Sequence, residues 1–447
     1  MARNTAYTDG PIGSVMIRTA LSMLPGTLAI SGYNIVDTYF VSKLGTLPMA
    51  AMGFTFPVVM LISCLFRGID NGIMTPTAQL LGGGRIPKAA RLISSGIILL
   101  TIISLLVGVA GSLTIDPVFR NLLKAEDVVM KDIRAYMIIW YMGSFTASLS
   151  MAANALLVTS GESRLAGMFM LGGLLLNVIL DPIFIFGWGF VPAMGVAGAA
   201  MATVIAQALG VIATAAVLHL KLRLIAPFNM PFAIISGHWK TILRYGIPAT
   251  CAMLLIPLGS MAVTRAVAEV GGEVAVAATA AATRIEVVAF VFPMSLGMAL
   301  LPMIGQNYGA KAWDRINQCR RFALRFAGLI LLLMAVIFTV FAPQISTLFS
   351  KDPQVLEIMI RYLRIVSWGL AGVEIHRFGG FFLNGCARPL GAALLNGSRV
   401  VVFLVPLTFA AVAMDWLDGI FYARLVSDVC AGIFGWICAR LITRSLQ

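Results

Sequence analysis

Acidic side chains within long apolar stretches are the residues of this 447-residue sequence best suited to do chemistry. Asp37 lies in the stretch GYNIVDTYF, near the end of the first apolar segment. A charge at the centre of a bilayer costs about 2.5–3.5 kcal/mol even on the lowest scales, so an ionisable group there is a functional candidate by default. The alternative is a solvated aspartate at a helix end, capping the next loop.

A second candidate is the string NVILDP, which contains Asn177 and Asp181. Residues four apart share one face of a helix, so the amide and the carboxylate are expected to lie side by side. Pro182 removes a backbone donor one residue later and can bend the helix or loosen its last turn. Such a group of oxygens can hold a proton or a small hard cation. The alternative is an aspartate beside a turn at the end of a helix.

Three further groups of charged residues lie in apolar stretches, and we expect structural pairing for each of them. Residues three apart share a helical face and can neutralise each other, whereas residues two apart point to different sides and need other partners. Arg284, Glu286 and Glu374 remain secondary candidates for a functional site. The groups are Arg67 with Asp70, Arg284 with Glu286, and Glu374 with His376 and Arg377.

The composition indicates which elements carry these residues. The chain is 60% hydrophobic and 11% charged, with a mean hydropathy of +0.94, whereas soluble domains carry about 25% charged residues. A crossing of the bilayer needs about 20 apolar residues. The sequence therefore predicts an all-α membrane protein with twelve transmembrane helices. The apolar stretches are 13–40, 48–80, 92–114, 135–160, 164–187, 194–218, 241–267, 275–306, 320–346, 360–386, 388–413 and 418–443.

The orientation follows from the basic loops, because Lys and Arg gather on the cytoplasmic side of membrane proteins. Basic residues cluster after the second and eighth stretches, in the central segment and in the tail, so both termini are expected in the cytoplasm. The same bias accounts for the net charge of +13, and no nucleic-acid partner is expected. The basic residues are Arg85, Lys88, Arg91, Lys221, Arg223, Lys240, Arg244, Lys311, Arg315, Arg320, Arg321, Arg440 and Arg444.

The two halves of the sequence repeat at an offset of 227, since Gly45 matches Gly272 and Gln79 matches Gln306 (272 − 45 = 227). Six helices in each half give both halves the same orientation, so the duplication predicts two pseudo-symmetric six-helix bundles. We expect an N-lobe at 1–218, a cytoplasmic linker at 219–240 and a C-lobe at 241–447. The offset places Asp37 opposite Thr264, so the acid belongs to one half only.

This sequence lacks the residues that several kinds of chemistry require. There is no GxxxxGK[ST] loop for ATP, and the six cysteines and three histidines have no metal-binding spacing. We therefore expect no enzyme activity, no cofactor and no bound metal, apart from Na⁺ as a coupling ion. An ion gradient remains as the source of energy.

Over nearly its whole length, the chain resembles the multidrug and toxic compound extrusion (MATE) family of the MOP superfamily. Within that family it resembles the DinF-like prokaryotic branch most closely. The resemblance rests on YNIVDTYFVSKLGTLPMAAMGF, AQLLGGG, NVILDPIFIFG followed by GVAGAAMAT, and GQNYGA. It implies antiport of H⁺ or Na⁺ against lipophilic, often cationic drugs by alternating access. It also implies a multi-pass protein of a prokaryotic inner membrane.

The resemblance assigns roles to particular residues. Asp37, Asn177, Asp181 and Thr203 match the ion-coupling cluster of that branch. The substrate cavity is matched by Tyr33, Asn34, Asn154 and Met170. We expect a monomer that contacts membrane lipid and a small-molecule drug, coupled to H⁺ rather than Na⁺. The alternative is a flippase of the same superfamily for lipid-linked oligosaccharide or lipid II, with Arg67, Arg265 and Arg284 as candidates to bind a pyrophosphate headgroup.

Overall fold

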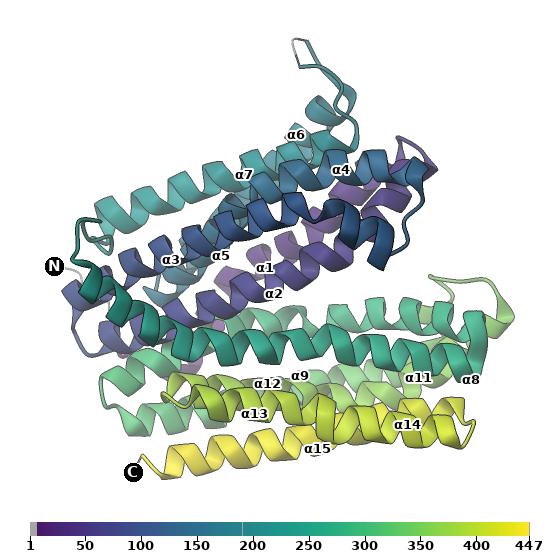
Figure 1. The fold of residues 1–447 in the computed structure, drawn as a ribbon. Helices are drawn as coiled ribbons and strands as arrows, with labels where there is room; N and C mark the ends of the chain where they lie inside the picture. The colour runs from purple at the N-terminus through teal and green to yellow at the C-terminus, as the bar shows by residue number, and fades with distance from the viewer. Residues whose placement is uncertain (1–6, 190, 447) are drawn as a thin grey trace. The chain divides into compact units, whose positions relative to one another are not determined.

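Helices joined by short turns make up the computed structural model (Figure 1), which describes residues 7–189 and 191–446, and all their side chains except those of residues 30, 31 and 34. In this described part the only bridge outside the helices is an isolated one between Trp188 and Val191, and no strand is formed. The predicted all-helical class is confirmed.

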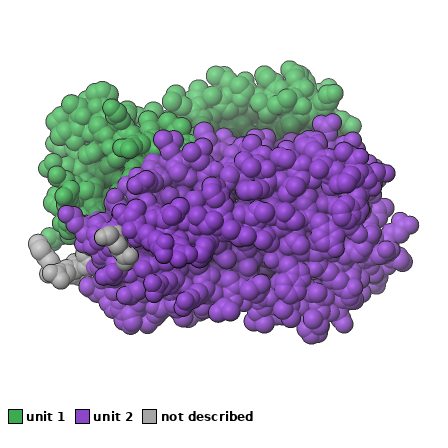
Figure 2. Space-filling model, turned by 90° about the horizontal axis from the view of Figure 1, so that it is seen from below, with its two compact units in different colours: residues 1–6, 22–250 green, residues 7–21, 251–447 purple. Residues whose placement is uncertain are grey.

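The chain divides into two compact units, which are coloured separately in Figure 2. Unit 1 contains Ser22–Thr250, and unit 2 contains Tyr7–Leu21 together with Cys251–Gln447. The N-terminal stretch belongs to unit 2 because polar side chains of that unit hold its backbone. Asn307 Nδ2 donates to the carbonyl oxygen of Tyr7 at 3.0 Å, and Arg315 Nη1 donates to that of Gly10 at 2.9 Å.

The helices of the N-terminal half follow the predicted apolar stretches, with one bend. The predicted fourth helix is a pair, α4 and α5, that meets at Gly143 with an angle of 50°. A Cβ atom on Gly143 would lie 2.2 Å from a methyl group of Val204, so only glycine fits there. The helices are α1 (Ile12–Ser42), α2 (Thr46–Gly82), α3 (Ile86–Leu113), η1 (Pro117–Leu122), α4 (Asp127–Met142), α5 (Ser144–Thr159), α6 (Ser163–Phe186), α7 (Val196–Ala216) and η2 (Val217–Lys221).

The C-terminal half begins within the longest helix, α8 (Phe232–Gly309), which contains the predicted seventh and eighth helices. They are separated at Gly272, whose φ of 66° lies outside the helical region. The remaining helices are α9 (Trp313–Val340), α10 (Ala342–Ser346), α11 (Pro353–Val366), η3 (Ser367–Gly369), α12 (Leu370–Gly385), α13 (Pro389–Ser398), η4 (Arg399–Leu404), α14 (Val405–Ala413) and α15 (Leu417–Arg444).

Length and composition alone make nine of the described helices capable of crossing a membrane, or ten with α4 and α5 taken as one bent span. That count takes α8 once, although α8 contains two predicted crossings. The predicted tenth stretch is formed by the segment from α11 to α12, which the count does not include. Each of the twelve predicted stretches therefore has a helical counterpart.

Both ends of the predicted linker, 219–240, are helical. His219 to Lys221 continue α7 as the segment η2, and α8 begins at Phe232, so the irregular connection is confined to 222–231. The first turns of α8 are held on α3 by Ser95. Its hydroxyl lies 2.9 Å from His238 Nδ1, and its carbonyl oxygen accepts a hydrogen bond of 2.9 Å from Trp239 Nε1.

Matching positions of the repeat have the same backbone role. Gly45 and Gly272 both have positive φ, 115° and 66°, and each precedes the second long helix of its half. Gly82 and Gly309 each end that helix. The pattern of matched glycines thus marks equivalent turns in the two bundles.

Helices α12 and α15 of unit 2 approach each other through glycine. A Cβ atom on Gly432 would lie 2.5 Å from Cα of Gly372, and one on Gly379 would lie 2.7 Å from the carbonyl oxygen of Gly435. Small residues allow this close packing in membranes, where hydrophobic burial does not drive helices together.

Unit 2 also has a polar core built on two arginines. Arg399 donates to Asp428 Oδ1 from Nη2 and Nε at 2.7 and 2.9 Å, and Asp428 is fully buried. Arg424 Nη2 lies 2.6 Å from Glu286 Oε2, and the same guanidinium also donates to the hydroxyl of Tyr362. Each buried carboxylate therefore has a cation beside it.

We expect Asp428→Ala to destabilise the protein strongly, because it leaves the largely buried Arg399, 19% exposed, without its carboxylate. Breaking a buried ion pair in this way costs about 3–5 kcal/mol of unfolding free energy. Thermal unfolding in detergent measures the effect. The control is Asp418→Ala, whose pair with Arg361 is 3.2 Å long and partly exposed, so about 0–1 kcal/mol is expected. Equal losses in the two variants would contradict the assigned role of Asp428.

Candidate functional site

The candidate site lies in unit 1, where α1 and α6 bring two aspartates together. Asp37 is 8% exposed, and Asp181 and Asn177 are fully buried. The carboxyl group of Asp37 lies within hydrogen-bonding reach of Asp181, Asn177 and Thr203. Three helices, α1, α6 and α7, thus contribute to one cluster, and all four residues predicted to couple the ion are in it.

The spacing within α6 and its packing against α7 produce this geometry. Asn177 Nδ2 lies 3.1 Å from Asp181 Oδ1, one helical turn away, and 3.4 Å from Thr203 Oγ1 on α7. The two helices approach closely, since a Cβ atom on Gly198 would lie 2.4 Å from the carbonyl group of Phe184. The amide of Asn177 therefore joins the carboxylate to the threonine hydroxyl.

Three oxygens of the cluster have no hydrogen-bond partner among the described residues: Asp37 Oδ1, Asn177 Oδ1 and Asp181 Oδ2. A buried acceptor left unsatisfied costs about 1–3 kcal/mol, and more when it is charged. Two carboxylates this close also disfavour ionisation of both at once. A proton or a small cation bound between them relieves both costs.

Two tyrosines lie close enough to Asp37 and Asp181 to interact with their charges. Tyr33 was predicted to line the substrate cavity; its hydroxyl oxygen would lie 2.5 Å from a Cβ atom on Gly173 of α6. Tyr136 of α4 is 6% exposed and was not assigned a role from the sequence. Nothing in the local spacing of Tyr136 indicated its position, which depends on how α4 packs.

The other predicted cavity residues have separate surroundings. Asn154 of α5 donates from Nδ2 to the carbonyl oxygen of Ser150 at 2.9 Å, and its Oδ1 is buried without a partner in the described part. Met170 of α6 packs on α1, with its sulfur 2.8 Å from where a Cβ atom on Gly26 would lie. The side chain of Asn34 lies outside the described residues.

The secondary candidates belong to unit 2. Glu374 is fully buried and forms an ion pair with Arg377, and Glu286 is paired with Arg424. Arg284 is exposed and forms no ion pair among the described residues. Sequence reasoning missed Asp428, Arg399 and Arg424; the spacing of Arg424 and Asp428, four residues apart in the last apolar stretch, was a usable signal.

Charge compensation distinguishes the aspartate pair from these acids. Within the described chain, Glu286, Glu374 and Asp428 each form an ion pair with an arginine, whereas Asp37 and Asp181 form none. Asp70 in α2 is also 8% exposed and forms no ion pair among the described residues, and Arg67 is exposed rather than bound to it. Among the residues that the structure describes, two such unpaired carboxylates meet only in the Asp37 cluster.

Comparison with known proteins identifies the family of the chain. The MatE family model matches residues 24–183 and 248–410. A protein of Shewanella oneidensis named "FAD transporter" is 31% identical over 439 residues, with 98% of this chain and 97% of that protein covered. The "Probable multidrug resistance protein YpnP" of Bacillus subtilis is 25% identical, and the match covers 92% of this chain and 90% of that protein.

A solved structure has the same fold. The Vibrio cholerae MATE transporter VcmN in its bent form superimposes with a TM-score of 0.91 at 29% identity, covering 97% of both chains. The family match spans both halves and includes Asp37, Asn177 and Asp181. The chain belongs to the MATE family of membrane transporters.

Proposed function

We propose that this protein is an ion-coupled antiporter that exports lipophilic, often cationic drugs by alternating access, with H⁺ as the coupling ion. The observation that carries the proposal is the pair Asp37 and Asp181, buried together without a compensating cation in the described structure. Relatives named as multidrug resistance proteins support the substrate class. The inner membrane of a prokaryote, cytoplasmic termini and a monomeric state belong to the same proposal.

The coupling we propose depends on the charge of the pair. When one aspartate is ionised, the negative charge of the pair attracts a cationic ligand. Burying that charge away from water costs free energy. Binding a proton removes that charge and changes the hydrogen bonds of Asn177 with Asp181 and Thr203. The ligand and the proton therefore compete for the same negative charge, which is the requirement for exchange.

Asp37→Asn is expected to abolish drug efflux without reducing expression, because asparagine keeps the shape but cannot exchange a proton. Efflux of a fluorescent cationic dye from cells gives the measurement. The matched control is Asp127→Asn, at an aspartate that is 81% exposed and paired with Arg120. Undiminished efflux by the Asp37 variant would refute the coupling role of this residue.

The coupling ion is tested in proteoliposomes with one gradient imposed at a time. A pH gradient in the absence of Na⁺ should drive dye movement, and a Na⁺ gradient at equal pH on both sides should not. The same oxygen atoms would suit Na⁺, so the opposite result would transfer the role from H⁺ to Na⁺ and leave the site unchanged.

A flavin dinucleotide is a second candidate substrate, favoured by the 31% identity to the protein named "FAD transporter" over 98% of this chain. FAD contains a negatively charged pyrophosphate group, which arginine can bind through two parallel hydrogen bonds. Arg265 and Arg284 of α8 are exposed, and neither has an ion-pair partner among the described residues. These two arginines are the candidates to receive such a group.

If FAD is exported, Arg284→Gln should reduce FAD transport by about tenfold or more, the equivalent of one charge-assisted hydrogen bond of about 1.5 kcal/mol. Export of a cationic dye by the same variant should be retained. Arg325→Gln, at another exposed arginine of unit 2, serves as the control. Absence of FAD uptake into inverted vesicles by the unmodified protein would exclude this substrate.

A further inference from the structure

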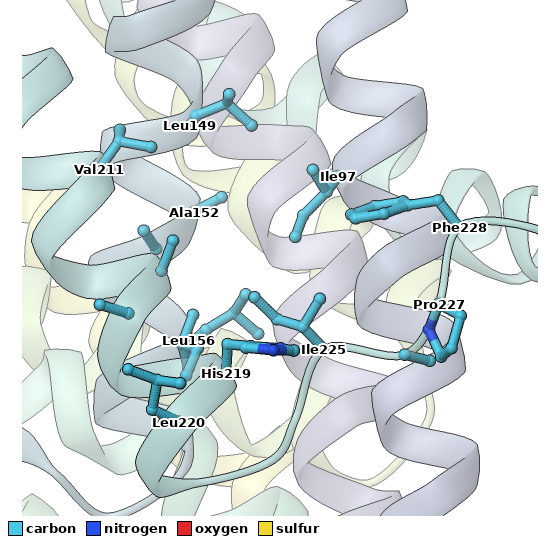
Figure 3. Close-up of a pocket in the computed structure, with 15 residues that line it drawn as sticks. Ile97, Leu149, Ala152, Leu156, Val211, His219, Leu220, Ile225, Pro227 and Phe228 are labelled. Atoms are coloured by element: carbon cyan, nitrogen blue, oxygen red, sulfur yellow. The ribbon is translucent and has the colours of Figure 1, made fainter.

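A cavity of about 620 Å³ lies in unit 1, apart from the aspartate cluster. Figure 3 shows side chains from α3, α5, α7 and the connection after α7 arranged around it. Its volume falls within the range of about 300–1,000 Å³ that is common for ligand sites. Representative lining residues are Ile97, Leu149, Leu156, Val211, Ile225 and Phe228.

The wall of this cavity is apolar and its rim is exposed. His219 is the one residue with a polar side chain among those that line it. Leu220 and Phe228 line the cavity and are themselves 74% and 54% exposed, and Ile212 on the same helix, α7, is 64% exposed. In a chain that spans a membrane, such exposed apolar side chains face lipid tails, so the cavity is suited to hydrocarbon rather than water.

The connection that forms one wall is fixed rather than loosely placed. Ser94 Oγ of α3 donates to the carbonyl oxygen of Ala226 and accepts from its amide nitrogen, both at 2.9 Å. These bonds hold Ala226, Pro227 and Phe228 beside α3, and all three line the cavity. The cavity is therefore part of the folded unit and does not depend on a free loop.

The segments that line the cavity carry basic residues and few acids. The chain from 71 to 115 and the chain from 182 to 268 contain no acidic residue. Glu162, the residue before α6, is already paired with Lys221 at 2.7 Å. Arg91, six residues before Ile97 on α3, and Arg223, two residues before Ile225, are both exposed and have no ion-pair partner among the described residues.

We propose that the cavity binds one acyl chain of an anionic phospholipid, whose phosphate is held by Arg91 and Arg223. The local charge decides between the lipophilic ligands that would fit by volume. A cationic drug would be repelled by the basic residues around the cavity, whereas a phosphate would be attracted by about 1 kcal/mol for each basic residue near the surface. Binding would stabilise the connection between α7 and α8 against α3.

The test uses the purified full-length protein in detergent, with dioleoyl phosphatidylglycerol or dioleoyl phosphatidylcholine added. Native mass spectrometry counts retained lipid, and thermal unfolding gives the shift of the midpoint. We expect phosphatidylglycerol to be retained and to raise the midpoint more than phosphatidylcholine does. Soluble glycerol phosphate should have no effect, because it lacks the acyl chain. Equal shifts with both lipids, or an equal shift with glycerol phosphate, would overturn the proposal.

Two kinds of variant locate the site. Ala215→Phe fills the cavity from α7, and Ala208→Phe, two turns earlier on the same face but not lining the cavity, is its control. Ala215→Phe should lose the preference for phosphatidylglycerol, and Ala208→Phe should keep it. If Ala215→Phe keeps the full preference, the lipid binds elsewhere and the proposal fails.

Charge variants test the same site without altering the cavity. Arg223 has a φ of 53°, a conformation that asparagine tolerates, so the variant is Arg91→Gln with Arg223→Asn. It should bind phosphatidylglycerol about thirtyfold more weakly, at about 1 kcal/mol for each charge. Lys131→Gln, at an exposed lysine of α4, is the control. An unchanged affinity in the double variant would contradict the assigned phosphate contacts.

Discussion

The constraint that governs this structure is the cost of an uncompensated charge away from water. In unit 2, arginine side chains compensate the charges of the buried acids. Glu286, Glu374 and Asp428 each have a guanidinium group within ion-pairing distance. Among the described residues, Asp37 and Asp181 of unit 1 have an amide, a hydroxyl, each other and two nearby tyrosines, but no cation. A carboxylate paired with a fixed cation has a structural role. Without such a cation, the charge of the carboxylate can be compensated only by a mobile proton or cation.

The two halves therefore share a backbone plan but not a distribution of charge. Equivalent glycines occupy equivalent turns, as Gly45 and Gly272 do with their positive φ angles. The position that matches Asp37 in the second half is Thr264. The buried acids of the two halves have different partners, arginines in unit 2 and an amide and a hydroxyl in unit 1. This asymmetry supports the proposal that coupling runs through the N-terminal half.

The sequence predicted the fold well because each crossing is a local property of about 20 residues. It also indicated Asp37 and Asp181 singly, since an acid in an apolar stretch stands out. What it could not supply was contact between helices far apart in the chain. The proximity of Tyr136 to the pair, the partnership of Arg399 with Asp428 and the assignment of Tyr7–Leu21 to unit 2 all depend on tertiary packing. The close approach of Gly143 to Val204 of α7 likewise depends on this packing.

The glycine contacts between α12 and α15 have a further consequence. Where two backbones touch with no side chain between them, neither helix can slide or turn without a steric clash, since no flexible group is present to yield. The two helices are therefore expected to move as one rigid body, held together at Gly372, Gly379, Gly432 and Gly435. Spectroscopic probes attached to the two helices would keep a constant separation throughout a transport cycle, and this separation would provide an internal length standard against which movement elsewhere in the molecule can be measured.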